Sequence, residues 1–248
     1  GLLTPDSEIE LYQLIRRYGI KDAKEIWNIA VKGVEIIADT AKKYKIKCDL
    51  ERQDSLFLGL GKSGYESVKK EAEAHDKINL SYKLYKEKDI KKVINSNAYT
   101  SALRTFDTYS INSLLYCQEL KRILLSKNVR IYENSEVFEI KENIAITKSG
   151  TVKADNIIMC IDKIKRKLSK FSRKRYHAQT FLAISKELTN KQIKSIFPHE
   201  KLMCWDSTLV YTYFKITKNN RFLVGGGSPL TTYYPAYFKS PIIINSVI

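Results

Sequence analysis

The feature that most constrains the fold is an apolar run in the second half of the chain, residues 154–161 (ADNIIMCI). A nearly continuous apolar run of this length predicts a strand buried on both faces, as parallel strands in α/β sheets are. The helix expected before it spans residues 112–125, with Asn112 or Ser113 as its N-cap. Between the two, we expect short strands at 129–132, 137–140 and 144–147.

This order of elements is typical of the second half of a nucleotide-binding α/β domain. The first 45 residues predict two further helices. One is capped by Asp6 or Ser7 and ends at Gly19, and the other covers 26–41 with apolar residues at three- and four-residue steps. The remaining expected elements are a strand at 54–60, helices at 63–78 and 86–94, and a strand at 99–103. We therefore expect a mixed α/β (α+β) fold.

The last third of the chain is expected to be mostly strands. These are placed at 176–184, 202–205, 209–216 and 222–225, with a capped helix at 189–196. In the third of these strands, Tyr211, Tyr213 and Lys215 share one face, and Phe214 and Ile216 point to the other. Residues 233–248 show weak organisation and are interpreted as a truncated end.

The net charge of the 248-residue chain is 43 − 27 = +16, which raises the question of nucleic-acid binding. The lysines are scattered, and only residues 163–175 are densely basic. No RNP, zinc-finger or basic-zipper signature accompanies them. A solvated helix and loop is the interpretation we favour for this segment, and a basic nucleic-acid-binding module is the alternative.

The four cysteines are dozens of residues apart and form no CxxC pair, and the histidines are not placed to complete a metal site. We expect reduced thiols, no metal and a cytoplasmic protein. No apolar run approaches the roughly 20 residues of a membrane-spanning helix, and no secretory leader is recognisable.

Four segments carry a resemblance to one family. They are GLLTPDSEIEL (1–11), NVRIYENSEVFEI (128–140), GTVKADNIIMCID (150–162) and YTYFKITKNNRFLVGG (211–226). The last three are similar to the family's "GV-I-E-x-T-x-V" strand pair, its "G-x-I-x-A-D-x-V-V-x-A-T-G" strand and its "Y-x-x-R-x-x-D-G-R-x-x-x-G-G" strand. The chain thus resembles the D-amino-acid oxidase-like flavoproteins, which include glycine, sarcosine and related amine oxidases and dehydrogenases.

The resemblance implies a partial FAD-binding Rossmann-like domain, residues 1–45 and 105–165, and an antiparallel-sheet substrate domain, residues 46–104 and 166–232. The family's GxGxxG loop would precede Gly1. The glycine cluster 225–227 does not replace it, because Ser228 and Pro229 follow rather than a helix. The chain is therefore expected to be a fragment, a split product that needs a partner chain carrying the GxGxxG segment, or a decayed copy.

For the cofactor FAD, the resemblance implies that the main chain of Val137 meets the adenine ring. Cys160 and Ile161 would lie near the phosphates, although the family has small residues there. The segment Leu2, Leu3 and Thr4 would lie beside the isoalloxazine ring. The structural alternatives are a core valine in a hairpin and a frayed chain terminus.

For the substrate, Tyr213 matches the family tyrosine that faces the substrate from the sheet over the flavin. Tyr211 and Lys215 share its strand face, and a cation there would suit an acidic substrate. Arg104 is a further candidate for a carboxylate ligand. The alternatives are an exposed amphipathic strand and an unpaired surface arginine. No catalytic acid–base pair is recognisable, and His177 is interpreted as a strand residue.

In the resembled family, a small-molecule amine or amino acid gives up hydride from its α-carbon to flavin N5, and water hydrolyses the resulting imine. The cofactor accepts the electrons, while the protein aligns the C–H bond and holds the substrate. The alternative functions are a non-catalytic remnant or subunit of such an oxidoreductase and the nucleic-acid-binding module.

Overall fold

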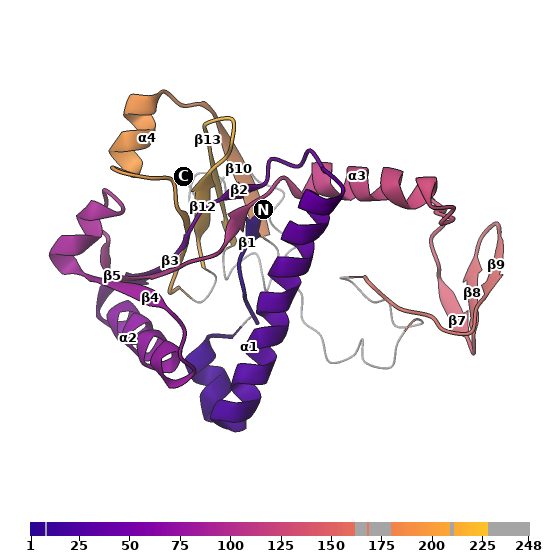
Figure 1. Cartoon of the computed structure of the whole chain (residues 1–248), viewed down its shortest axis with the longest axis horizontal. Helices are drawn as coiled ribbons and strands as arrows, with labels where there is room; N and C mark the ends of the chain where they lie inside the picture. The colour runs from indigo at the N-terminus through magenta and orange to yellow at the C-terminus, as the bar shows by residue number, and fades with distance from the viewer. Residues whose placement is uncertain (8, 162–167, 169–179, 209–210, 228–248) are drawn as a thin grey trace, which may run out of the picture. The chain divides into compact units, whose positions relative to one another are not determined.

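The computed structural model describes residues 1–7, 9–161, 168, 180–208 and 211–227. The chain divides into two compact units. The large unit comprises Gly1–Leu120 and Ala178–Ile248, and the small unit comprises Lys121–His177. Figure 1 shows the chain with its helices and strands labelled.

The large unit is built on a mixed seven-stranded sheet, in the order β10-β13-β12-β11-β3-β5-β4. Only the pair β11 and β3 is parallel, and the other neighbours are antiparallel. The strands are β3 (Ser55–Leu60), β4 (Tyr82–Lys86), β5 (Tyr99–Thr105), β10 (Thr180–Glu187), β11 (Met203–Asp206), β12 (Tyr213–Ile216) and β13 (Arg221–Gly227). The sheet unites strands from the first half of the chain with strands from its last third.

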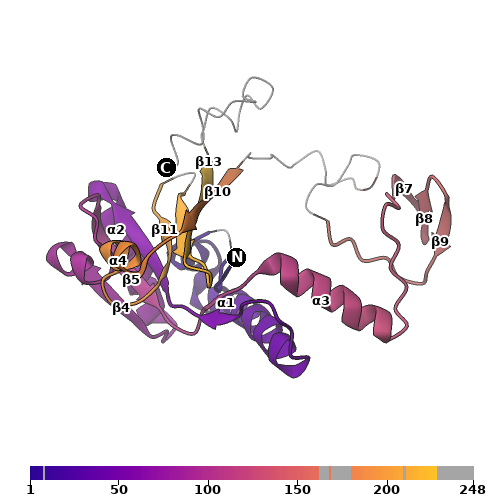
Figure 2. The ribbon, with the colours of Figure 1, turned by 90° about the horizontal axis from the view of Figure 1, so that it is seen from above.

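Helices cover part of each face of this sheet. On one face, helix α2 (Gly61–Lys77) packs Val68 and Ala72 against Phe57 and Leu103. On the other face, the 3₁₀ helix η1 (Glu87–Lys92) and helix α4 (Asn190–Ile196) close the main core, in which Leu56, Cys204 and Phe214 are buried. Figure 2 gives a second view of these helices and the sheet.

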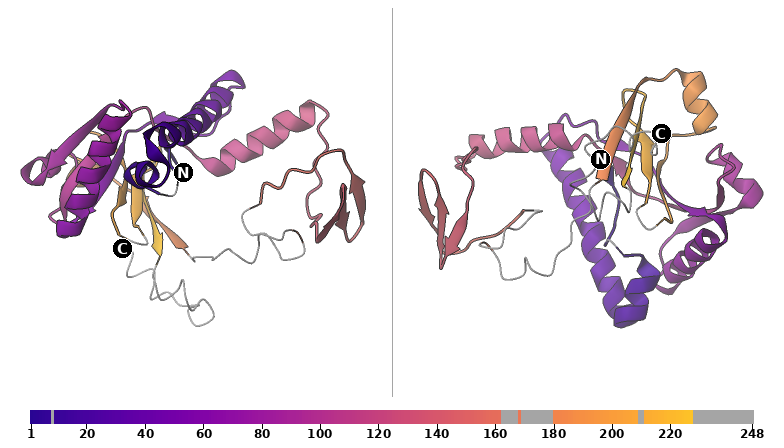
Figure 3. Two further views of the ribbon diagram at one scale, coloured as in Figure 1. Left: turned by 90° about the horizontal axis from the view of Figure 1, so that it is seen from below. Right: turned by 180° about the vertical axis from the view of Figure 1, so that it is seen from behind.

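Helix α1 (Leu11–Lys43) is bent at Gly19, whose φ of 80° lies in the left-handed region that glycine adopts without strain. The predicted end of a helix at Gly19 therefore coincides with a real break between two helical segments. The predicted caps are wrong: the N-cap is Glu10, and the hydroxyl of Ser7 donates to the carbonyl of Ile9. The N-terminal part of α1 packs against the end of α2, as the two views in Figure 3 show.

A second, three-stranded sheet orders the N-terminal segment. Strand β1 (Leu2–Leu3) and strand β2 (Glu51–Arg52) pair with opposite edges of β6 (Tyr109–Ser110), both antiparallel. These three short strands were not expected from the sequence. Leu2 and Leu3 thus belong to a sheet, and the alternative of a frayed terminus is wrong.

The small unit contains a three-stranded antiparallel sheet of β7 (Glu139–Lys141), β8 (Ile144–Thr147) and β9 (Gly150–Lys153). The helix α3 (Ser113–Ser126) precedes it, and the amide of Leu115 donates to the side chain of Asn112 as predicted. The predicted strands at 129–132 and 154–161 are absent from the described structure. Residues 154–161 pair with no strand among the described residues, so no neighbouring element buries their two faces. The side chain of Ile158 is accordingly 85% exposed.

Several predictions fall outside the described residues. These are the dense basic stretch, most of residues 162–179 including His177, and the tail 233–248. Among the described residues, no helix is long and apolar enough to cross a membrane. The mixed fold itself is as expected.

Candidate functional site

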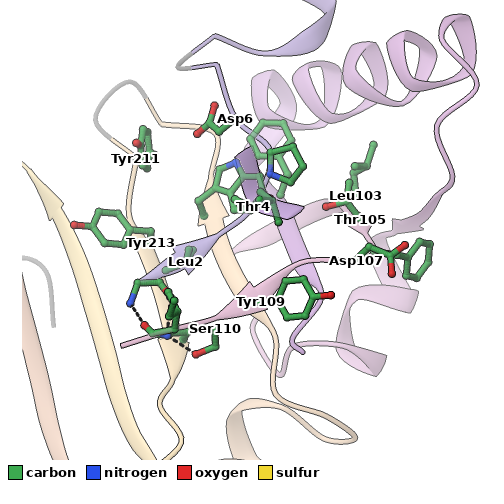
Figure 4. Close-up of a pocket in the computed structure, with 18 of the residues that line it drawn as sticks. Leu2, Thr4, Asp6, Leu103, Thr105, Asp107, Tyr109, Ser110, Tyr211 and Tyr213 are labelled. Atoms are coloured by element: carbon green, nitrogen blue, oxygen red, sulfur yellow. Dashed lines mark hydrogen bonds between the residues drawn. The ribbon is translucent and has the colours of Figure 1, made fainter. Parts of the chain in front are cut away.

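The large unit holds a cavity of about 1890 Å³ on one face of the seven-stranded sheet. Its walls come from the sheet, from α1, from the segment Gly1–Tyr12 and from the stretch around β6. In Figure 4, Tyr211 and Tyr213 lie at one end of the drawn pocket and Leu103 and Thr105 at the other, with Leu2 and Thr4 between them. The cavity is large enough for a ligand of drug size or above.

The strand alternation predicted for β12 is confirmed. Tyr213 and Lys215 face the cavity, whereas Phe214 and Ile216 are buried in the main core. The neighbouring strand β13 turns leucine and arginine side chains to the same side as Tyr213. The candidate substrate strand therefore presents its polar face to a cavity and its apolar face to the core.

The ring of Tyr213 lies directly over Gly225 of strand β13. A Cβ atom at Gly225 would lie 2.3 Å from Cζ of Tyr213, which is far below any permitted contact. Burial raises the pKa of the Tyr213 phenol, while its hydrogen bond with Thr180 acts in the opposite direction. The phenol therefore stays protonated near neutral pH and can donate or accept a hydrogen bond. The ring centroids of Tyr211 and Tyr213 are 6.0 Å apart.

Lys215 is buried, with 2% of its surface exposed, and its ammonium group is already engaged. It donates to the carbonyl of Gly1 at 2.9 Å and to the hydroxyl of Ser110. Burial lowers the pKa of Lys215, and its bond to the N-terminal residue together with the charges of Glu51 and Asp49 acts to raise it. Lys215 thus ties strand β12 to β1 and β6 and holds the N-terminal segment in the cavity wall.

Leu2 and Thr4 line the cavity, whereas Leu3 does not. The alternation follows from the extended conformation of β1, in which successive side chains point to opposite sides. The segment that the family resemblance assigns to the isoalloxazine ring and the strand assigned to the substrate therefore border one cavity in the large unit.

Arg104 lies on the other face of the sheet and does not line the cavity. Its guanidinium group pairs with Asp54 and, at 2.7 Å, with Glu200. These carboxylates are strong hydrogen-bond partners that leave no reason to place a substrate there. We therefore remove Arg104 from the candidate site. The alternative of an unpaired surface arginine is also wrong.

A buried pair on α2 that also lines the cavity, Glu71 and His75, is not among the residues predicted from the sequence. The carboxylate of Glu71 accepts the backbone N–H groups of Leu11 at 3.1 Å and Tyr12 at 3.2 Å, and so supplies the missing cap of α1. Burial raises the pKa of Glu71 to about 7, although these two hydrogen bonds act to lower it. The sequence signal for this pair is that Glu71 and His75 stand four residues apart, on the thin apolar face of their helix.

The remaining candidates lie in the small unit. Val137 is half-buried, and within the described residues its main-chain N–H and C=O form no hydrogen bond, although the next residue, Phe138, donates to Ile146. Cys160 and Ile161 are exposed. An unpaired main-chain N–H and C=O, as at Val137, is what the edge of an adenine ring would require.

All four cysteines are free thiols, as expected, with Cys48 and Cys204 buried. Cys117 and Cys160 are exposed. In the described part of the chain, no group of three or more His, Cys, Asp or Glu side chains could hold a metal ion.

Comparison with known proteins identifies the family. Residues 4–240 match the family model DAO, described as FAD dependent oxidoreductase. Two curated proteins are similar: the probable oxidoreductase OrdL of Haemophilus influenzae, 22% identical over 87% of this chain, and the gamma-glutamylputrescine oxidoreductase of Escherichia coli, 27% identical over 86%. The chain spans about half of their lengths, 52% and 51%.

Solved structures show the same fold. Glycine oxidase from Geobacillus kaustophilus superposes with a TM-score of 0.72 at 12% identity, covering 100% of this chain and 64% of that one. L-Proline dehydrogenase from P. horikoshii gives a TM-score of 0.65 at 13% identity, covering 87% and 59%. At these identities the likeness concerns the fold alone.

Proposed function

Because this chain belongs to the DAO family of FAD dependent oxidoreductases, we propose that it forms the substrate-facing part of an enzyme that oxidises the C–N bond of a small amine or amino acid. The observation that carries the proposal is the shared cavity wall of Leu2, Thr4 and Tyr213. These residues come from the two segments that the family resemblance assigns to the flavin ring and to the substrate.

The described residues fit an FAD in two respects. The cavity in the large unit is of sufficient size, and the main chain of Val137 in the small unit has a free donor and acceptor for the adenine edge. We propose that Leu2, Leu3 and Thr4 contact the ring system and that Cys160 and Ile161 lie near the phosphates. Bound FAD would supply the acceptor of a hydride from the substrate α-carbon.

The protein's own contribution in this proposal is alignment. The Tyr213 phenol, fixed over Gly225, hydrogen-bonds a polar group of the substrate, and Tyr211 packs beside it. Lys215 acts as a positioning residue because its ammonium group donates hydrogen bonds to Ser110 and Gly1. Alignment of this kind is adequate for the reaction, since the reaction needs no acid–base pair.

We further propose that residues 1–45 and 105–165 belong to the FAD-binding part and residues 46–104 and 166–232 to the substrate part. The family's GxGxxG-bearing segment would complete the former, in the same polypeptide or in a partner chain. Apolar side chains of the small unit, among them Val129, Ile158 and Met159, are exposed and support such a contact. The chain's coverage of about half of its curated relatives is in agreement.

The test is reduction of bound FAD. The protein that contains this chain, together with the family's dinucleotide-binding segment, is loaded with FAD and mixed without oxygen with small amines and amino acids. We expect at least one of them to bleach the visible absorbance of the flavin. If none does so, the chain is the non-catalytic remnant that stands as the alternative.

A paired substitution locates the substrate. Tyr213→Phe removes one hydrogen bond worth about 1 kcal/mol, so the rate of flavin reduction at low substrate concentration should fall roughly fivefold. Tyr132→Phe, in the small unit and exposed, serves as the control and should leave the rate unchanged. Equal rates for both variants would remove Tyr213 from the site.

A further inference from the structure

The side chain of Tyr213 reaches across one strand of the sheet to the next. Tyr213 on β12 pairs with Gly225 on β13, and Gly225 pairs in turn with Leu182 on β10. Side chains two residues apart on a strand point to the same side, so Thr180 shares the face of Leu182. Thr180, Leu182 and Tyr213 all line the cavity.

Gly225 allows this reach because it has no side chain. A Cβ atom at Gly225 would lie 2.5 Å from the phenol oxygen of Tyr213, as well as 2.3 Å from Cζ. The hydroxyl end of the ring therefore lies over β13, where any other residue would place its own side chain. From there the phenol forms a hydrogen bond with the side chain of Thr180 on β10, the next strand of the sheet.

The direction of this hydrogen bond decides what Tyr213 can offer to a ligand. A phenol and a threonine hydroxyl each hold one proton that they can donate. If Thr180 donates, the phenol keeps its own proton for an acceptor on the ligand. If the phenol donates, that proton is already used.

The electrostatic effect of the bond distinguishes the two directions. A hydrogen bond donated to the phenol oxygen favours the ionised phenol, whereas a bond donated by the phenol favours the protonated one. The bond with Thr180 acts to lower the pKa of Tyr213. This sign agrees with donation by Thr180.

We propose that Thr180 is a positioning residue for Tyr213: its hydroxyl donates to the phenol oxygen and so leaves the proton of the phenol for an acceptor atom of the substrate. This inference rests on the proposed function. It assigns no substrate contact to Thr180, which acts only through Tyr213.

The first test needs neither substrate nor flavin reduction. The protein that contains this chain is labelled with 3-fluorotyrosine and titrated by fluorine NMR, and the signal of Tyr213 is assigned by its loss in Tyr213→Phe. Thr180→Val removes the donor and keeps a side chain of similar shape, so the titration midpoint of Tyr213 should move to higher pH by about one unit.

Two further variants serve as controls for this titration. Thr180→Ser keeps the hydroxyl and should retain the native midpoint. Thr151→Val, at an exposed strand position of β9 in the small unit, should retain it as well. A midpoint that moves to lower pH in Thr180→Val would show that the phenol donates to Thr180, and an unchanged midpoint would show that the two side chains are not coupled. Either result overturns the inference.

The second test asks whether Thr180 acts through Tyr213 during flavin reduction. The rate at low substrate concentration is compared for Thr180→Val, Tyr213→Phe and the double variant. Thr180→Val alone should slow the reaction about threefold. Added to Tyr213→Phe, it should cost nothing further, because the hydrogen bond has already lost one partner. Losses that multiply in the double variant would overturn the inference.

The outcomes separate this inference from the proposed function. Flavin reduction together with a native midpoint in Thr180→Val overturns the inference and leaves the proposed function intact. If no amine or amino acid reduces the flavin, the proposed function fails, and the role of Thr180 toward a substrate fails with it even where the titration shows the hydrogen bond.

Discussion

At the scale of single residues, Gly225 controls the position of Tyr213. Gly225→Ala places a methyl group 2.3 Å from the ring, so the tyrosine must move or the strand must shift, at a cost of roughly 1–3 kcal/mol of unfolding free energy. Gly226→Ala is the control, because its Cβ would meet no atom closer than 3.6 Å. Urea unfolding of both variants, followed by tryptophan fluorescence, checks the difference. Equal stability of the two would contradict the packing described here.

Glu71 should make stability depend on pH. Its pKa rises from 4.5 to about 7 on folding because it is buried, with Glu10 and Asp6 adding repulsion and His75 neutral beside it. The folded protein therefore keeps a proton that the unfolded chain has lost, so the contribution of Glu71 to stability is fully present below pH 4.5 and is lost as the pH rises to about 7. The total loss is on the order of 3 kcal/mol.

The variant Glu71→Gln should flatten the unfolding free energy across that pH window. Glu73→Gln, an exposed position on the same helix, should retain the slope of the native protein. A Glu71→Gln protein with an unchanged pH profile would show that the Glu71 carboxyl does not hold the extra proton.

How far single residues could be predicted depended on whether their role was local. The alternation of Tyr213 and Lys215 against Phe214 and Ile216 follows from strand geometry and is confirmed. The engagement of Lys215 with Ser110 could not be predicted, because the two residues are 105 positions apart in the sequence. Glu71 as the cap of α1 is unpredictable for the same reason.

At the scale of elements, α4 was the most predictable helix because its signal is local. The side chain of Thr189 accepts from the amide of Gln192, whose own side chain accepts from the amide of Thr189. Thr189→Ala should lower the unfolding free energy by about 1 kcal/mol, whereas Thr189→Ser keeps the hydroxyl and most of the stability. Chemical unfolding measures both. A cost for alanine no larger than that for serine would show that the cap contributes little.

The segment 154–161 shows where element prediction failed. Its apolar run meets the local requirement for a buried strand, but a strand also needs neighbours with which to form hydrogen bonds, and here it has none among the described residues. The exposed side chain of Ile158 is the result. Sequence patterns report the preference of a segment, and tertiary partners decide whether that preference is realised.

At the scale of the whole molecule, the mixed α/β class and the family were predictable, since short matching segments are spread in order along the chain. The seven-stranded order was not, because it pairs β3 with β11, and their partner residues Ser55 and Met203 are 203 − 55 = 148 positions apart. We propose that Leu2 and Thr4, together with Tyr213 on β12, border the flavin and its substrate in the cavity of the large unit.

Hydrogen exchange with and without FAD tests this claim most directly. In the protein that contains this chain and the family's dinucleotide-binding segment, we predict that FAD slows amide exchange both in the segment Leu2–Thr4 and in the strand of Tyr213. Protection of only one of these regions, or of neither, in a protein that has bound FAD would contradict the account.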